Sequence, residues 1–235
     1  MGAPGEQGWY QRFRLESSPT SCMTSERGSY HAAMDTLEAI TSRRSVKHFE
    51  LGHELTADEE RTLFEHAILS PTSFNMQNWR FVVVKDRDLR AQIRDAGFGQ
   101  AQLTDASLLI ILTADLKAFG QDPQRYWKDA PPEISEAMVS MMVPFYEGNE
   151  QLQRDEAMRS IGIAAQTLMI TARGLGYDSC PMIGFDVERV ARIIRLPEDH
   201  AVGMIVVIGK RLKDPQPRGG QLGLEEVVIE DQFER

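Results

Sequence analysis

The sequence predicts a single domain that mixes α-helices and β-strands, of the α+β or α/β class. Three apolar runs rich in β-branched residues have the length of buried strands: Phe81–Val84, Leu108–Thr113 and Val202–Ile208. Segments with helical spacing of apolar residues stand before, between and after these runs, without an internal repeat or an obvious linker. With 235 residues, the chain can bury a core without disulfides or a structural metal.

Three short helices are predicted in the first half of the chain. The first ends near residues 42–44. Thr56 and Glu59 have the spacing of a capping box and begin the second helix, which ends shortly before Pro71. The third helix lies between the first two strands and stops at Gly97.

Longer helices are predicted in the second half. Prolines interrupt residues 115–150, which predicts a loop and then a helix around Ile134–Met142. A long helix follows and ends at Gly174 or Gly176. Its apolar residues recur at alternating spacings of four and three: Ile161, Ala165, Leu168, Ala172 and Leu175. Asp186 is the expected N-cap of a further helix.

Composition excludes several classes of function. The chain has 35 acidic and 26 basic residues and a net charge of −9, so it lacks a chain-wide basic surface for nucleic acid. Its two cysteines build no disulfide framework, which favours the reducing cytoplasm. The apolar runs are too short to span a bilayer, so no membrane partner is expected.

The sequence also lacks several motifs of catalysis and metal binding. Residues 97–102, GFGQAQ, do not complete a dinucleotide fingerprint and do not follow a strand. We find no phosphate-binding P-loop, no nucleophile elbow and no His/Cys cluster that would hold a metal. Cys180 is an isolated thiol, and we expect it to be buried and inert rather than nucleophilic.

Residues 1–33 differ from the rest of the chain. They mix Gly, Pro, Ser and charged residues without an apolar period. We expect a disordered extension or leader rather than a signal peptide, followed by a single domain over residues 34–235. An expression leader, an upstream start before Met34 and a mobile arm remain alternatives.

Two polar segments carry candidate chemistry. The run Arg43-Arg44-Ser45-Val46-Lys47 follows the first helix; it could complement that helix's dipole, or bind a phosphate with its guanidinium groups and hydroxyl. The loop at residues 70–79, SPTSFNMQNW, could be a capped turn or a surface that binds the edge of a planar heterocycle.

Four segments together resemble the nitroreductase family of flavoproteins. They are the run RRSxK at 43–47, the loop SPxSxNxQxW at 70–79, the segment CPMIGFD at 180–186, and GKR at 209–211 with Pro217-Arg218. The resemblance extends from about Met34 to the C-terminus. It implies an α+β fold: an α/β/α sandwich around a mostly antiparallel sheet, in a homodimer that binds FMN at its interface. A C-terminal strand, here Val227–Ile229, would cross to the partner.

The resemblance also implies roles for individual residues. Arg43, Arg44 and Ser45 would contact the FMN phosphate and ribityl chain, and Lys47 the pyrimidine edge. Ser73, Asn75 and Gln77 would meet the ring from the partner subunit. Pro181, Met182, Ile183 and Gly184 would line the ring, with Ile183 and Gly184 beside N5. Lys210 and Arg218 would add phosphate contacts, although Arg211 competes for this role.

Two segments depart from the family or vary within it. Asn78 stands where the family loop usually has proline, which puts the local turn in question. Segment 115–150 lies where the family places its substrate-covering helices. Its aromatic and sulfur-containing residues could cover a substrate or pack in the core: Tyr126, Trp127, Met141, Met142, Phe145 and Tyr146.

The implied activity is that of an FMN-dependent oxidoreductase. NADH or NADPH would deliver hydride to the flavin, and a nitroaromatic, quinone or similar small molecule would accept it in a ping-pong reaction. Since the flavin carries the chemistry, no catalytic side chain and no metal are expected. Alternatives are other flavin chemistry on the same fold, such as reductive dehalogenation or ring oxidation, and flavin binding or storage without catalysis.

Overall fold

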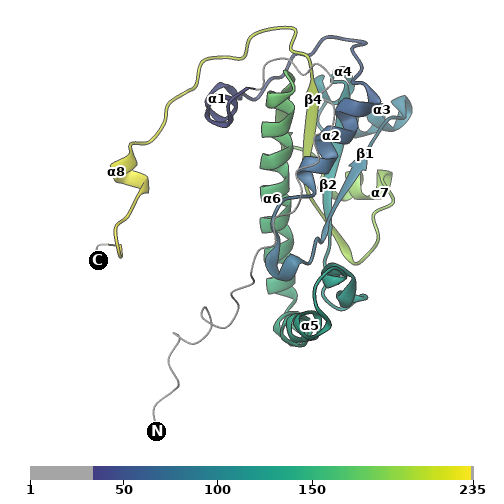
Figure 1. Cartoon of the computed structure of the whole chain (residues 1–235). Coiled ribbons are helices and arrows are strands. Elements are labelled where there is room, and N and C mark those ends of the chain that lie inside the picture. Colours follow the sequence, from purple (N-terminus) through teal and green to yellow (C-terminus); the bar gives the residue numbers. More distant parts are fainter. Residues whose placement is uncertain (1–33, 234–235) are drawn as a thin grey trace. The chain divides into compact units, whose positions relative to one another are not determined.

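The computed structural model describes residues 34–233, and its four strands form one antiparallel sheet in the order β1-β2-β4-β3 (Figure 1). The strands are β1 (Trp79–Val83), β2 (Leu108–Asp115), β3 (Asp178–Met182) and β4 (His200–Gly209). Since every neighbouring pair is antiparallel, the fold is α+β, as the family resemblance implies. Residues 1–33, the predicted extension, lie outside the described residues.

The longer helices lie where the sequence predicted them. The helices are α1 (Thr36–Ser42), α2 (Ala57–Ala67), α3 (Arg87–Ala96), α4 (Gln102–Asp105), α5 (Pro132–Tyr146), α6 (Glu150–Gly174), α7 (Val187–Ile193) and α8 (Leu224–Val227). Two 3₁₀ helices, η2 (Ser73–Asn75) and η3 (Pro123–Trp127), join them. The capping box of Thr56 and Glu59 is formed at the start of α2, and Asp186 caps α7 through the backbone N–H of Arg189.

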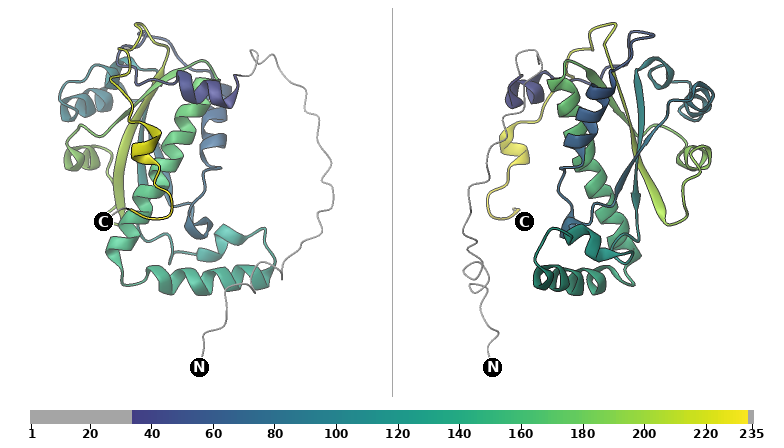
Figure 2. Two further views of the ribbon diagram at one scale, coloured as in Figure 1. Left: turned by 90° about the vertical axis from the view of Figure 1, so that its left-hand side faces the viewer. Right: turned by 45° about the vertical axis from the view of Figure 1, so that its right-hand side comes forward.

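Helices cover both faces of the sheet, which makes the predicted α/β/α sandwich (Figure 2). Alternate residues of β2 enter two separate cores because successive side chains of a strand point to opposite faces. Ile110 and Leu112 pack in a core with residues of α2 and α6. Leu109 and Ile111 pack in the other core with residues of α3 and α7.

The long helix α6 packs closely on the sheet. Alanines on its buried face keep it slim, and Gly203 of β4 lies directly beneath Ile161. A Cβ atom at position 203 would lie 2.7 Å from Ile161 Cδ1, so a larger residue could not fit without a shift. This contact fixes the distance between α6 and β4.

A third, smaller core forms below the sheet around α5 and η3. Its buried residues are Met76, Ala118, Phe119, Tyr126, Met142 and Tyr146. Helix α5 begins earlier and ends later than the expected 134–142. Pro144 lies within its last turn and does not end it. Three of the six candidate covering residues, Tyr126, Met142 and Tyr146, are therefore part of a core.

Strand β3 was not predicted, and it lies at an edge of the sheet. It pairs with β4 on one side, and on the other Ser45 alone makes a bridge to it, at Ser179. Its fourth residue is Pro181, which has no N–H to donate.

The C-terminal tail differs from the expected strand within this chain. Val227 is the last residue of α8, and Val228 and Ile229 belong to no strand. All three side chains are exposed. A strand at this position therefore stays a prediction for the assembled dimer. Of the helices in residues 34–233, none combines the length and apolarity that crossing a membrane requires.

Candidate functional site

Sequence-distant basic residues meet at one end of the sheet, which we call the basic end (residues 43–47 and 210–218). The segment after α1 runs along the ends of β3 and β4 (Figure 1). The backbone N–H of Val46 donates to Ser179 O at 3.0 Å, and that of Glu50 donates to Lys210 O at 2.8 Å. These bonds bring the run 43–47 beside the GKR segment, as the resemblance implies.

The cations of the basic end differ in their partners. Arg218 Nη2 donates to the carbonyl oxygens of Arg43 at 3.0 Å and Thr41 at 3.2 Å, so its guanidinium ties the tail to the end of α1. Arg211 Nε lies 3.8 Å from a carboxylate oxygen of Asp178. Among the described residues, Lys210 is exposed and has no carboxylate within 4.0 Å.

Within residues 34–233, one buried polar atom of the basic end and one of the adjacent strand β3 lack partners. They are Arg43 Nη1 and the hydroxyl oxygen of Ser179, whose residue is 1% exposed. Buried donors without acceptors are uncommon and costly, by about 1–3 kcal/mol each. Each of these atoms can donate to an acceptor oxygen of a ligand.

Cys180 follows Ser179 in β3 and is a buried free thiol. Burial raises the pKa of this thiol, and the positive charges of Lys47 and Arg43 oppose the increase without cancelling it. The thiol therefore stays protonated at neutral pH, in agreement with the predicted inert cysteine.

The turn after β3 contains Ile183 and Gly184, which are exposed. Gln100 Nε2 donates to the carbonyl oxygen of Gly184 at 2.9 Å and to that of Gly97 at 3.0 Å. Gln100 thereby holds the turn against the end of α3. The sequence gives no local signal for this role, because Gly184 is 84 residues from Gln100.

The loop that contains Ser73, Asn75 and Gln77 lies at the opposite end of the sheet, and we call residues 72–78 the loop end. Three residues there have left-handed backbones: φ is 52° at Phe74, 52° at Asn75 and 45° at Gln77. Asparagine tolerates this conformation, but phenylalanine and glutamine do so at a cost. Such strain is concentrated at functional sites in other proteins.

Side-chain hydrogen bonds hold the loop end in place. Asn75 Nδ2 donates to Tyr126 O at 2.7 Å, and the N–H of Gln77 donates to the hydroxyl of Thr72 at 2.9 Å. The N–H of Ser73 faces a carboxylate oxygen of Glu156 at 3.4 Å. Asn78, which replaces the family proline, is 1% exposed, and its carbonyl accepts from Asp115 N at 2.9 Å.

A cavity of about 580 Å³ opens beside the loop end. Asn75 and Gln77 line it together with three cations and two aromatic residues: Arg80, Arg125, Lys128, Trp79 and Tyr126. Arg80 Nη1 donates to the carbonyl oxygens of Gln77 and Trp79, each at 2.9 Å. The cavity was not predicted, because its cations are scattered over 49 positions of sequence.

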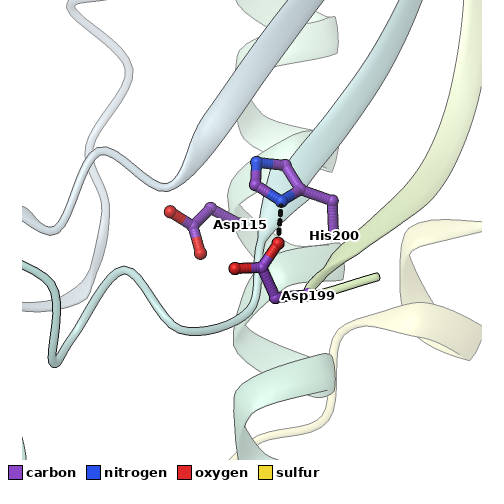
Figure 3. A group of neighbouring side chains, drawn as sticks. All are labelled: Asp115, Asp199 and His200. Atoms are coloured by element: carbon purple, nitrogen blue, oxygen red, sulfur yellow. Dashed lines mark hydrogen bonds and ion pairs between the residues drawn. The ribbon is translucent and has the colours of Figure 1, made fainter. Parts of the chain in front are cut away.

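Asp115, Asp199 and His200 lie close together and form a group of possible metal ligands (Figure 3). Each carboxylate already has protein partners. Asp115 accepts from Lys117 N and lies 3.6 Å from Arg80 Nη2, while Asp199 accepts from His200 Nδ1 at 2.7 Å. The hydrogen bond from His200 lowers the pKa of Asp199. Asp115 thus helps to position Arg80, and Asp199 is paired with His200.

Three of the covering candidates, Tyr126, Trp127 and Phe145, are divided between core and surface. Tyr126 is 8% exposed, yet its ring faces Arg125 at 4.8 Å and lines the cavity. Trp127 packs partly on the third core. Phe145 is exposed and lies 5.8 Å from the ring of Phe74.

The basic end and the loop end are far apart within one chain. Asn78 lies at the level of His200, where β4 starts, and Lys210 follows Gly209, where β4 ends. Ten residues of antiparallel strand separate them, a distance of about 30 Å. A small ligand cannot contact both ends of the same chain.

Comparisons with known proteins identify the family of this chain. Residues 40–210 match the nitroreductase family. Protein DrgA from Synechocystis sp. is 56% identical over 181 residues, which cover 77% of this chain and 86% of DrgA. The Bacillus subtilis protein named "Putative NAD(P)H nitroreductase MhqN" is 33% identical over 80% of this chain and 95% of its own length.

A solved structure shows the same fold. It is described as a "putative nitroreductase in complex with FMN" from Exiguobacterium sibiricum 255-15. The two chains are 26% identical and superpose with a TM-score of 0.78, covering 86% of this chain and 99% of the other. The match over residues 40–210 and the identity to DrgA establish that this chain belongs to the nitroreductase family.

Proposed function

We propose that this chain is an FMN-dependent oxidoreductase that uses NADH or NADPH to reduce a nitroaromatic, quinone or similar acceptor in a ping-pong reaction. The family membership, the name of MhqN and the FMN-bound relative support the class of activity. Bound FMN would accept a hydride from the nucleotide and pass electrons to the acceptor. The chain itself has to bind the flavin and orient the two substrates against it.

The basic end fits the phosphate of FMN, and this is the observation that carries the proposal. Cations from segments more than 160 residues apart meet there on a chain that is otherwise acidic. Arg43 Nη1 and the Ser179 hydroxyl are buried without partners, and phosphate oxygens would accept from both. Lys210 is the best candidate for the further phosphate contact, because Arg211 and Arg218 already have partners.

Strand β3 would guide the ring from the phosphate. It leads from Ser179 at the basic end to Ile183 and Gly184, over about 16 Å of extended chain. Ile183 would supply an apolar surface, and the bond from Gln100 to Gly184 would fix the backbone beside the ring. Pro181 and Met182 complete this side of the proposed site.

A homodimer would complete the site. Ser73, Asn75 and Gln77 lie about 30 Å from the basic end of their own chain, so they could meet a ring bound there only from a second copy. Exposed apolar residues on α1, such as Leu37 and Ile40, offer surface that a second copy could cover. The buried free thiol of Cys180 agrees with a reducing, cytoplasmic location.

The open cavity at the loop end favours turnover over storage. A storage protein would close the ring face, whereas a cavity of about 580 Å³ beside Asn75 and Gln77 leaves space for a substrate.

The first experiment is a visible absorption spectrum of protein incubated with FMN and desalted. We expect flavin bands that are retained and that bleach when NADPH or NADH is added without oxygen. Turnover with nitrofurazone and menadione, compared with a halotyrosine, then distinguishes the proposed acceptors from dehalogenation. Retained bands that neither nucleotide bleaches would contradict the activity, and absent bands would contradict the flavin site.

A further inference from the structure

We propose that Arg125 and Lys128 bind the pyrophosphate of the pyridine dinucleotide in the cavity beside the loop end. This inference rests on the proposed function for the identity of the ligand. The cavity itself, its charge and its position are features of the structure.

The cavity is positively charged on an acidic protein. Arg80, Arg125 and Lys128 line it, and among the described residues Asp129 is the single carboxylate of the lining. The whole chain carries a net charge of −9, so this concentration of cations is not a consequence of composition. Such a pocket attracts an anion over the surrounding surface.

The three cations are not equivalent. Arg80 is anchored by two backbone carbonyls and by Asp115, which compensates much of its charge. Within residues 34–233, neither Arg125 nor Lys128 has a carboxylate oxygen within 4.0 Å. These two charges are therefore available to a ligand, while Arg80 is bonded to the loop through the carbonyl oxygen of Gln77.

Arg125 is held in a defined position. Its Nη2 donates to the hydroxyl of Tyr126 at 2.7 Å, and its guanidinium carbon lies 4.8 Å from the centre of that ring. The hydroxyl of Tyr126 raises the pKa of Arg125, with smaller contributions from the charges of Asp115 and Asp122. A guanidinium fixed on an aromatic face keeps its other N–H groups free to donate to phosphate oxygens.

The position of the cavity indicates which anionic group of the dinucleotide binds there, namely the pyrophosphate. Asn75 and Gln77, the residues proposed to meet the flavin ring, line the same cavity. The nicotinamide has to stack on that ring, and one ribose separates it from the pyrophosphate. The 2′-phosphate of NADPH lies beyond the second ribose and would reach farther from the loop.

The test compares hydride donors with and without a pyrophosphate, using FMN-loaded protein. In the double variant Arg125→Gln and Lys128→Gln, we expect KM for NADH and for NADPH to rise about tenfold, as for the loss of two partly solvated ion pairs. KM and kcat for 1-benzyl-1,4-dihydronicotinamide, which has no phosphate, should stay unchanged. The Kd for binding of NADP⁺ to the oxidised, FMN-loaded double variant, measured by calorimetry, should also rise about tenfold.

Two further variants sharpen the test. Asp129→Asn removes the carboxylate of the lining and should lower both KM values by about twofold. Arg189→Gln removes an exposed cation of α7 that faces no part of the cavity lining, and it should change neither KM nor Kd.

Several results would overturn the inference. Equal changes with the benzyl donor would mean general damage to the site, and a change confined to NADPH would assign the cations to the 2′-phosphate. Unchanged Kd for NADP⁺ would show that the cavity does not bind the dinucleotide. Failure of all three donors to reduce the flavin of the unmodified protein would contradict the proposed function instead, and the calorimetry would still report on the cavity.

Discussion

Main-chain hydrogen bonds place the segment after α1 at the basic end, whereas side-chain hydrogen bonds and a strained turn shape the loop end. At the basic end, the segment after α1 is bonded through its main chain to β3 and to the end of β4. At the loop end, Asn75 and Thr72 make the contacts through their side chains, and three residues have positive φ. The main-chain bonds of residues 46–50 do not depend on side chains, although Arg44 and Arg218 tie the tail to this segment through theirs. The loop end depends on the particular side chains of Thr72 and Asn75.

The largest expected effect comes from a variant that abolishes phosphate binding at the basic end but leaves the fold intact. The double variant Arg43→Ala and Arg44→Ala should raise the Kd for FMN by about 10²- to 10⁴-fold, because two charge-assisted hydrogen bonds are lost. Titration of FMN fluorescence measures this change, with Arg189→Ala as a control cation. Because main-chain bonds place the segment, the melting temperature of the apoprotein should change little. Unchanged FMN affinity would place the phosphate elsewhere.

A second prediction tests how the basic end is supported. Tyr177 precedes β3, and its hydroxyl donates to Glu59 at 2.9 Å, which connects β3 to the start of α2. Burial, followed by the hydrogen bond and charge of Glu59, raises the pKa of Tyr177 from 10.0 to about 12. Tyr177→Phe should lower the free energy of unfolding at pH 8 by about 1 kcal/mol.

The same variant should alter the dependence of stability on pH. A raised pKa in the folded state means that the folded protein keeps a proton that the unfolded chain loses. The stabilisation is complete below pH 10 and is lost as pH rises from 10 to about 12. Urea unfolding at pH 8, 10 and 11 should show a steeper alkaline loss for the unmodified protein than for Tyr177→Phe. Parallel curves would contradict this role.

The smallest expected effect concerns the strain of the loop end. Gln77→Asn keeps a side-chain amide and places a residue that tolerates φ of 45°. The free energy of unfolding of this variant should rise by about 0.5 kcal/mol. This is less than the cost of a left-handed conformation for an ordinary residue, about 1–2 kcal/mol. Since the amide is shortened by one carbon, acceptor turnover should fall. Thermal unfolding and steady-state kinetics measure the two changes, and a less stable variant would refute the strain argument.

The sequence predicted the parts of the fold that have a regular apolar pattern. The runs at Leu108–Thr113 and Val202–Ile208 became β2 and β4, because both faces of these strands are buried under helices. β3 was missed because its sequence, DSCPM, is short, polar at its start and interrupted by proline. Only its pairing with β4 makes it a strand, and a pairing partner is not a local property of sequence.

The candidate site was predictable where residues close in sequence act together. The run 43–47 and the GKR segment carry recognisable patterns, and the fold brings them side by side. The cavity was not predictable, since Arg80, Arg125 and Lys128 are far apart in sequence and meet only in the folded chain. Gln100 was missed for a related reason, because its partner Gly184 is 84 residues away.

Pro181 protects the edge strand β3 against pairing with other chains in a crowded solution. An exposed strand edge invites another chain to extend the sheet, and this is a common start of aggregation. Here residues 45–46 occupy the first part of the edge through Ser179, and Pro181 offers no N–H to a further strand. The turn at Ile183 and Gly184 can therefore stay uncovered for a ligand without exposing a template for misassembly.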